Sequence, residues 1–89
     1  MKAATVVGVV ESYRRGPGTQ RSRECIVRFR GVGSPSEAAR LVGRTVEWRR
    51  GDLIIRGKVV SIHGRGGAVR VRFRRGLPGQ ALGTEVRLI

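Results

Sequence analysis

The stretch GAVRVRFRRGLPG, residues 67–79, alternates arginines with apolar side chains. In a β-strand successive side chains point to opposite faces, so the apolar residues would fill a core while the arginines line up outside at intervals of roughly 6.5–7 Å. A guanidinium group can hold two phosphate oxygens, and phosphates along a nucleic-acid strand repeat on a similar scale. A purely solvated face is the alternative, but like charges in register are costly without a counter-charge. The alternation therefore predicts a phosphate-binding ridge of Arg70, Arg72 and Arg74, with Arg75 directly after it.

Five other side chains could contact the same anion. Lys58 lies on the strand before the ridge, and the HGRGG turn places Arg65 at the tip of a hairpin. Two accounts of His63 stay open: a ring nitrogen that caps a backbone carbonyl, and a contact to the backbone or a base of RNA. Arg14 and Arg15 begin a loop rich in glycine and proline that is typical of a solvated basic finger. These five residues, the ridge and Arg75 are the predicted contact residues.

Catalysis and metal binding have few candidate residues. The chain holds one histidine, one cysteine and six acidic residues, without a recognisable carboxylate pair or Ser–His–Asp grouping. A lone His63 and a lone Cys25 cannot complete a structural metal site, and one cysteine forms no internal disulfide. The HGRGG turn leads into a strand rather than into the helix that a phosphate-binding P-loop requires. We therefore expect no enzyme, no cofactor and no metal.

The charge of the chain points to an anionic partner. Nineteen lysines and arginines and six acidic residues give a formal net charge of +13. Such an excess repels itself unless an anion lies against it, and nucleic acid is the commonest such partner. Aromatic residues make up only 4% of the chain, whereas proteins that read single strands stack bases on several exposed rings. Trp48 shares a strand face with Val46, so we expect it in the core rather than as a stacking platform.

Six expected strands, one short helix and no long linker predict a single domain over residues 1–89. Alternating and β-branched stretches between glycine turns favour a small all-β fold, here a six-stranded antiparallel β-barrel curved at glycines such as Gly8 and Gly57. In the second strand the alternation places Cys25 toward the core and Ile26 on the mainly polar outer face. The expected strands cover residues 5–13, 24–30, 44–50, 53–64, the ridge itself and 84–89.

The sequence SPSEAARLVG predicts the helix. Ser34 would be its N-cap, Pro35 its first residue, Glu37 the second partner of a capping box and Gly43 its terminator. A helix of about two turns is stable only when it packs on something else, so we expect it to close one end of the barrel. The residues expected to face the sheet are Ala38, Leu41 and Val42.

The second half of the chain resembles a known family. Residues 57–87 contain Gly-Lys, an apolar strand, His-Gly, a spaced Gly, Val-Arg, Phe, Leu-Pro and a last Gly before a Val-Arg strand. This order is similar to that of the ribosomal protein L35Ae family, large-subunit proteins of archaea and eukaryotes, as is the order of VESYRRG, the helix, Gly43 and Trp48 upstream. The residues that carry the resemblance are Gly57, Lys58, His63, Gly64, Gly67, Val69, Arg70, Phe73, Leu77, Pro78, Gly83, Val86 and Arg87.

This resemblance implies a non-enzymatic structural constituent of the large ribosomal subunit in the cytoplasm, with a barrel similar to those of translation factors. Its partners would be folded large-subunit rRNA, bound through the arginine-rich face, and neighbouring ribosomal proteins, without a membrane or a small-molecule substrate. Because the chain ends at Ile89, before the extension of eukaryotic members, we expect an archaeal type. Two rivals stay open: a chromatin protein that coats duplex DNA without regard to sequence, and a barrel module that binds tRNA.

Overall fold

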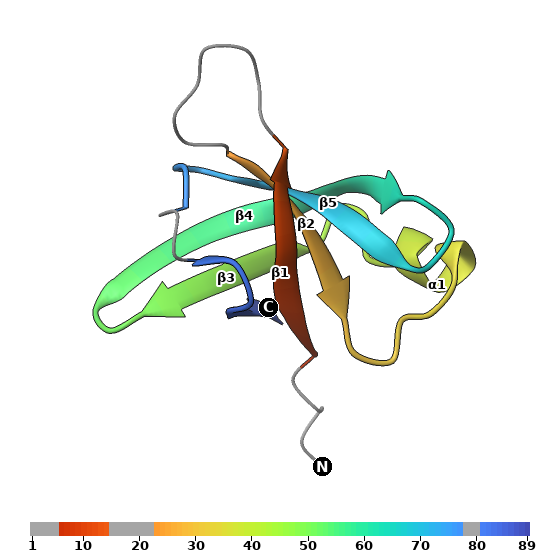
Figure 1. Cartoon of the computed structure of the whole chain (residues 1–89), viewed down its shortest axis with the longest axis horizontal. Coiled ribbons are helices and arrows are strands. Elements are labelled where there is room, and N and C mark those ends of the chain that lie inside the picture. The colour runs from red at the N-terminus through yellow and green to blue at the C-terminus, as the bar shows by residue number, and fades with distance from the viewer. Residues whose placement is uncertain (1–5, 15–22, 78–80) are drawn as a thin grey trace.

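The computed structural model describes residues 6–14, 23–77 and 81–89, which form a closed barrel with strand order β1-β2-β5-β4-β3-β6 (Figure 1). Every neighbouring pair of strands is antiparallel. The predicted six-stranded antiparallel barrel with one short helix is confirmed. Its elements are β1 (Val7–Arg14), β2 (Glu24–Phe29), α1 (Pro35–Ala39), β3 (Thr45–Arg50), β4 (Leu53–His63), β5 (Ala68–Phe73) and β6 (Glu85–Leu88).

Two glycines let core rings approach the backbone closely. A Cβ at Gly57 of β4 would lie 2.8 Å from a ring carbon of Phe73, and a Cβ at Gly8 of β1 would lie 2.8 Å from a ring carbon of Phe29. Any other residue at these two positions would push a core ring aside, which is why the curved strands carry glycine there. The bulges lie elsewhere, in β1 between Val10 and Ser12 and in β4 between Val59 and Ser61.

Trp48 of β3 is the largest side chain of the core and is fully buried. Its indole Nε1 donates a hydrogen bond to Thr84 Oγ1 at 2.8 Å, and the Thr84 hydroxyl donates in turn to the Ala81 carbonyl. The prediction that Trp48 belongs to the core is confirmed. Cys25 is buried as predicted, and this burial, with a smaller effect of the Glu24 carboxylate, raises the pKa of its thiol to about 12.

Replacing Trp48 by phenylalanine should lower the free energy of unfolding by about 2–3 kcal/mol, because the change leaves a cavity and removes the donor to Thr84. Urea denaturation followed by circular dichroism measures the loss. Thr84→Ser is the matched control, since it keeps the hydroxyl and should cost less than about 1 kcal/mol. A Trp48→Phe protein as stable as the wild type would contradict this account of the core.

Ile26 of β2 departs from the expected pattern. It lies outside the core cluster, as its place in the alternation requires, yet it is only 5% exposed. It stands directly opposite Ser12 of β1 and Arg70 of β5, so side chains on both neighbouring strands are close enough to cover it. The expectation of a polar, solvated face was therefore wrong at this position, because the stem of an arginine can shield an apolar neighbour.

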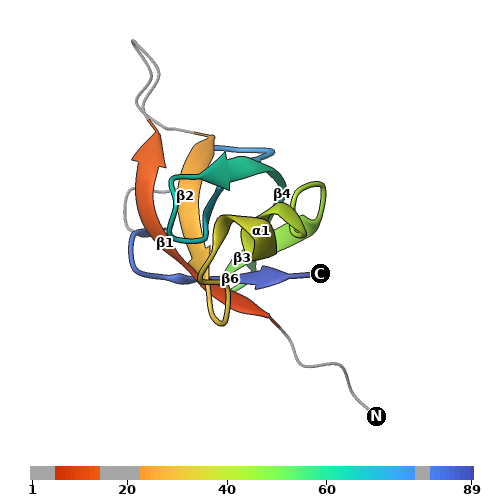
Figure 2. The ribbon, with the colours of Figure 1, turned by 90° about the vertical axis from the view of Figure 1, so that its right-hand side faces the viewer.

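The helix begins as predicted and ends earlier. Ser34 accepts the N–H of Glu37 as N-cap, and the Glu37 carboxylate accepts the N–H of Gly33 rather than that of the cap residue. Helix α1 packs against β4 and β5 at one end of the barrel (Figure 2). Because it stops at Ala39, helical spacing does not extend to Val42, which is 44% exposed. The expectation that Val42 faces the sheet was wrong, whereas Ala38 and Leu41 are buried.

Candidate nucleic-acid interface

The arginine ridge lies on the outer side of β5 and its C-terminal end. Arg72 has a side chain that is 66% exposed, and it stands opposite Glu24 of β2 on one side and Lys58 of β4 on the other. Arg74 is also exposed, and its backbone N–H donates to the Arg56 carbonyl at 2.9 Å. The apolar residues that alternate with the ridge positions are at most 1% exposed; they are Val69, Val71 and Phe73. One short strand therefore presents an apolar side to the core and a cationic side to the surface.

Glu24 supplies a counter-charge from within the protein. Its carboxylate lies 3.9 Å from Nε of Arg70 and 3.8 Å from Nε of Arg72. The sequence interpretation named no counter-charge within the protein, whereas one carboxylate of the chain lies between two guanidinium groups of the ridge. Partly exposed pairs of this length contribute little stability, and one carboxylate cannot neutralise two arginines and the neighbouring Lys58. The ridge keeps an excess of positive charge.

Two adjoining grooves cross the strands beside the ridge. The first, of about 310 Å³, is lined by Thr45, Arg56, Gly57, Lys58, Arg72 and Arg74. The second, of about 440 Å³, is lined by Ile54, Ile55, Arg56, Arg74 and Arg75. We call the first the cationic groove and the second the mixed groove. All charged residues that line either groove are cationic, so both grooves carry positive charge on the outer side of the barrel.

Arg56 was missed by the sequence interpretation although it lines both grooves. The signal was present, because Arg56 and Lys58 are two residues apart on β4 and must share its outer face. A carboxylate oxygen of Glu47 on β3 lies 3.6 Å from its Nε, but the Arg56 side chain remains 60% exposed. We define the basic face as Arg56, Lys58, Arg70, Arg72, Arg74 and Arg75.

His63 and Arg65 do not join the basic face. Both are exposed, but His63 is the last residue of β4 and Arg65 belongs to the β4–β5 turn, which lies beside α1 and at the far end of β5 from Arg74 (Figure 1). Ala68 stands opposite His63, and Arg74 lies six residue steps further along the extended chain, a span of roughly 20 Å. The side chain of Arg14 and the whole of Arg15 lie outside the described residues, so both stay sequence-based predictions.

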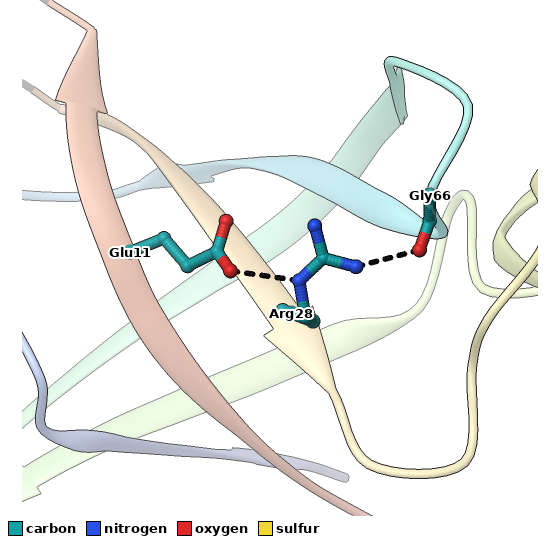
Figure 3. Close-up of polar contacts among 3 residues, drawn as sticks. All are labelled: Glu11, Arg28 and Gly66. Atoms are coloured by element: carbon teal, nitrogen blue, oxygen red, sulfur yellow. Dashed lines mark hydrogen bonds and ion pairs between the residues drawn. The ribbon is translucent and has the colours of Figure 1, made fainter.

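Arg28 of β2 anchors the β4–β5 turn (Figure 3). Its Nε donates to Glu11 Oε2 of β1 at 2.7 Å, and its Nη1 donates to the carbonyl oxygen of Gly66 in the turn at 2.6 Å. Charge-assisted bonds of this length are stronger than neutral ones, and together they join two strands and the turn. Arg28 is therefore engaged within the protein, and its guanidinium positions the segment that carries Arg65.

An Arg28→Ala variant should keep its barrel but loosen this turn. Because the Glu11–Arg28 pair is about half exposed, we expect a loss of only about 1 kcal/mol in the free energy of unfolding. Amide hydrogen exchange at residues 64–67 should rise about tenfold, since the Gly66 carbonyl loses its partner. Glu11→Gln is the matched control because it keeps an acceptor for Arg28 Nε. Unchanged exchange in Arg28→Ala would show that the turn is held by its other contacts.

The part of the chain that the structure describes offers no metal centre: no three His, Cys, Asp or Glu side chains come together there in a way that could hold an ion. No helix among those residues is long and apolar enough to cross a membrane. What the described residues do bring together is cationic charge on one side of the barrel.

Comparison with known proteins places the chain among its relatives. Residues 5–89 match the family model described as Ribosomal protein L35Ae. The chain belongs to the ribosomal protein L35Ae family. It is 60% identical to the large ribosomal subunit protein eL33 of Methanopyrus kandleri over 91% of this chain and 92% of that protein. It is 38% identical to the eL33 of Aeropyrum pernix over 92% and 88% of the two chains, and 33% identical to that of Dictyostelium discoideum over the same shares.

The resemblance to the L35Ae family is thus confirmed, and the chain is a ribosomal protein by family. Several residues that carry the resemblance have a structural explanation in this L35Ae chain. Gly64, Gly67 and Gly83 adopt positive φ angles of 68°, 91° and 78°, which favour glycine. Leu77 and Val86 are at most 2% exposed and belong to the core. The family pattern therefore describes mainly the barrel and its turns, and only a minority of its residues lie on the basic face.

Proposed function

We propose that this protein is a structural, non-catalytic constituent of the large ribosomal subunit and binds folded rRNA through the basic face. The observation that carries the proposal is the cationic groove, whose charged lining residues are all arginine or lysine: Arg56, Lys58, Arg72 and Arg74. Neighbouring β-strands lie about 4.8 Å apart and outward side chains repeat every ~6.6 Å, so the groove presents a grid of cations that suits successive phosphates. Family membership supports the same role, because the curated relatives are named large ribosomal subunit proteins.

The contacts of such a face are expected to be phosphate contacts. Guanidinium groups on a rigid sheet bind the RNA backbone and fix orientation, but they do not by themselves read sequence. Folded rRNA offers shape and closely spaced phosphates, which a fixed pattern of cations can select. Arg65 on the anchored turn and His63 at the end of β4 would touch a second, separate part of the RNA or a neighbouring ribosomal protein, since they lie well away from Arg74.

Sedimentation of a cell lysate through sucrose at low and at high salt tests the proposal. A protein held by many buried phosphate contacts should migrate with the large subunit and stay with it through the salt wash. Migration with nucleoid DNA would favour the chromatin role, and a free protein that binds tRNA tightly would favour a tRNA-binding module. Either of these two results would overturn the proposed function.

A further inference from the structure

The mixed groove combines apolar surface with positive charge. Ile54, near the start of β4, is 37% exposed and lines this groove with Ile55, which is only 4% exposed. The rest of the lining is Arg56, Arg74 and Arg75. The exposed part of Ile54 therefore lies in one groove with three arginines, which places apolar surface directly beside positive charge. A ligand that covers Ile54 and also pairs with these arginines must be apolar on one side and anionic within a few ångströms.

An unstacked nucleotide has this combination of properties. Its base has two apolar faces that pack on aliphatic side chains or on the plane of a guanidinium, and its phosphates match the fork of an arginine. The groove volume of about 440 Å³ falls within the ~300–1,000 Å³ typical of sites for small ligands. An acidic peptide with an apolar side chain has similar chemistry.

Continuity with the cationic groove favours the nucleotide over the peptide. The two grooves share Arg56 and Arg74 and therefore lie next to each other. One RNA molecule can occupy both. A helical RNA stem on the cationic groove can deliver a bulged base to the mixed groove without a second partner. The β3–β4 hairpin that carries Ile54 extends away from α1, at the end of the molecule opposite the β4–β5 turn (Figure 1).

We propose that the mixed groove holds one unpaired, unstacked nucleobase of the RNA while the flanking phosphates lie on Arg74 and Arg75. This inference rests on the proposed RNA-binding function and adds to it a preference for a bulged nucleotide. Aliphatic contacts and guanidinium stacking act on the π-face that every base has, so the groove selects an unpaired base rather than a particular sequence. The low aromatic content of the chain fits this mode, because a single base needs no series of exposed rings.

Two short RNA duplexes that differ by one bulged adenosine test the proposal. Fluorescence anisotropy at physiological salt should give the wild-type protein about tenfold tighter binding to the bulged duplex than to the fully paired one. In the Ile54→Ser variant this preference should fall below about twofold, because the base loses its apolar contact. Leu53→Ser is the matched control: Leu53 is the neighbouring residue, is 39% exposed and does not line the groove, so the preference should persist.

The outcomes separate this inference from the function on which it rests. Equal binding of the two duplexes by the wild type, or equal loss of preference in both serine variants, would overturn the bulged-base site while leaving phosphate binding intact. Failure to bind either duplex would overturn both. Tighter binding of an acidic leucine-containing peptide than of the bulged duplex would assign the groove to a protein partner instead. A change in the chemical shift of the Ile54 δ1 methyl only with the bulged duplex would support the site without any substitution.

Discussion

An Arg72→Ala/Arg74→Ala double variant should bind a large-subunit rRNA fragment about 100-fold more weakly than the wild type at low salt. Both side chains are exposed and line the cationic groove, so the double change removes two of the proposed phosphate contacts. Each lost contact should also reduce the slope of log affinity against log salt by about one. Anisotropy titrations at several salt concentrations measure the affinity and the slope together.

The control for this variant must remove the same charge elsewhere. Arg30→Ala/Arg40→Ala does so at two exposed positions outside the basic face, and we expect it to weaken binding much less. The fold should survive in both proteins, because the Arg72–Glu24 pair is 3.8 Å long and mostly exposed on the arginine side. Equal losses in the two double variants would mean that net charge, and not the geometry of the groove, governs binding. A melted barrel after the Arg72/Arg74 change would contradict the separation of apolar core and basic surface.

The alternation in residues 67–79 was the most informative part of the sequence. A strand has a period of two, so Val71 pointing inward requires Arg70 and Arg72 to point outward, and the structure has this arrangement. The same rule applied to β4 would have added Arg56 to the predicted contact residues, because Arg56 lies two residues before Lys58 and shares its face. Within one strand, therefore, the inward and outward side chains could be predicted, because a local period needs no knowledge of the neighbouring strands.

Features that depend on register between distant strands were not predicted. Glu24 lies beside Arg70 and Arg72 only because β2 pairs with β5 in one particular register, and Ile26 is covered for the same reason. Which residues stand opposite one another is decided by the closure of the whole barrel, with its bulges in β1 and β4. The mixed groove likewise needs the start of β4 and the end of β5 side by side, which no local pattern reports.

The largest loss of stability among these predictions is expected for Gly67→Ala in the β4–β5 turn, at about 3 kcal/mol or more. Gly67 has a φ of +91°, and a Cβ there would overlap the Val32 carbonyl oxygen and lie 2.9 Å from its carbon. The alanine therefore adds backbone strain and also pushes the turn off the loop that follows β2. Because a domain of this size is only marginally stable, such a loss should be clear in urea denaturation.

Gly64→Ala separates backbone strain from the clash with Val32. Gly64 lies in the same turn and also has a positive φ, of +68°, but a Cβ there would have no neighbour within 4 Å. It should cost only about 1 kcal/mol, the strain of a left-handed alanine. The difference between the two variants then measures how firmly the turn is seated against Val32. Equal losses would show that strain alone accounts for both glycines. A larger loss at Gly67 would mean that packing on Val32 helps to hold the turn that carries Arg65, which Arg28 also holds through its bond to Gly66.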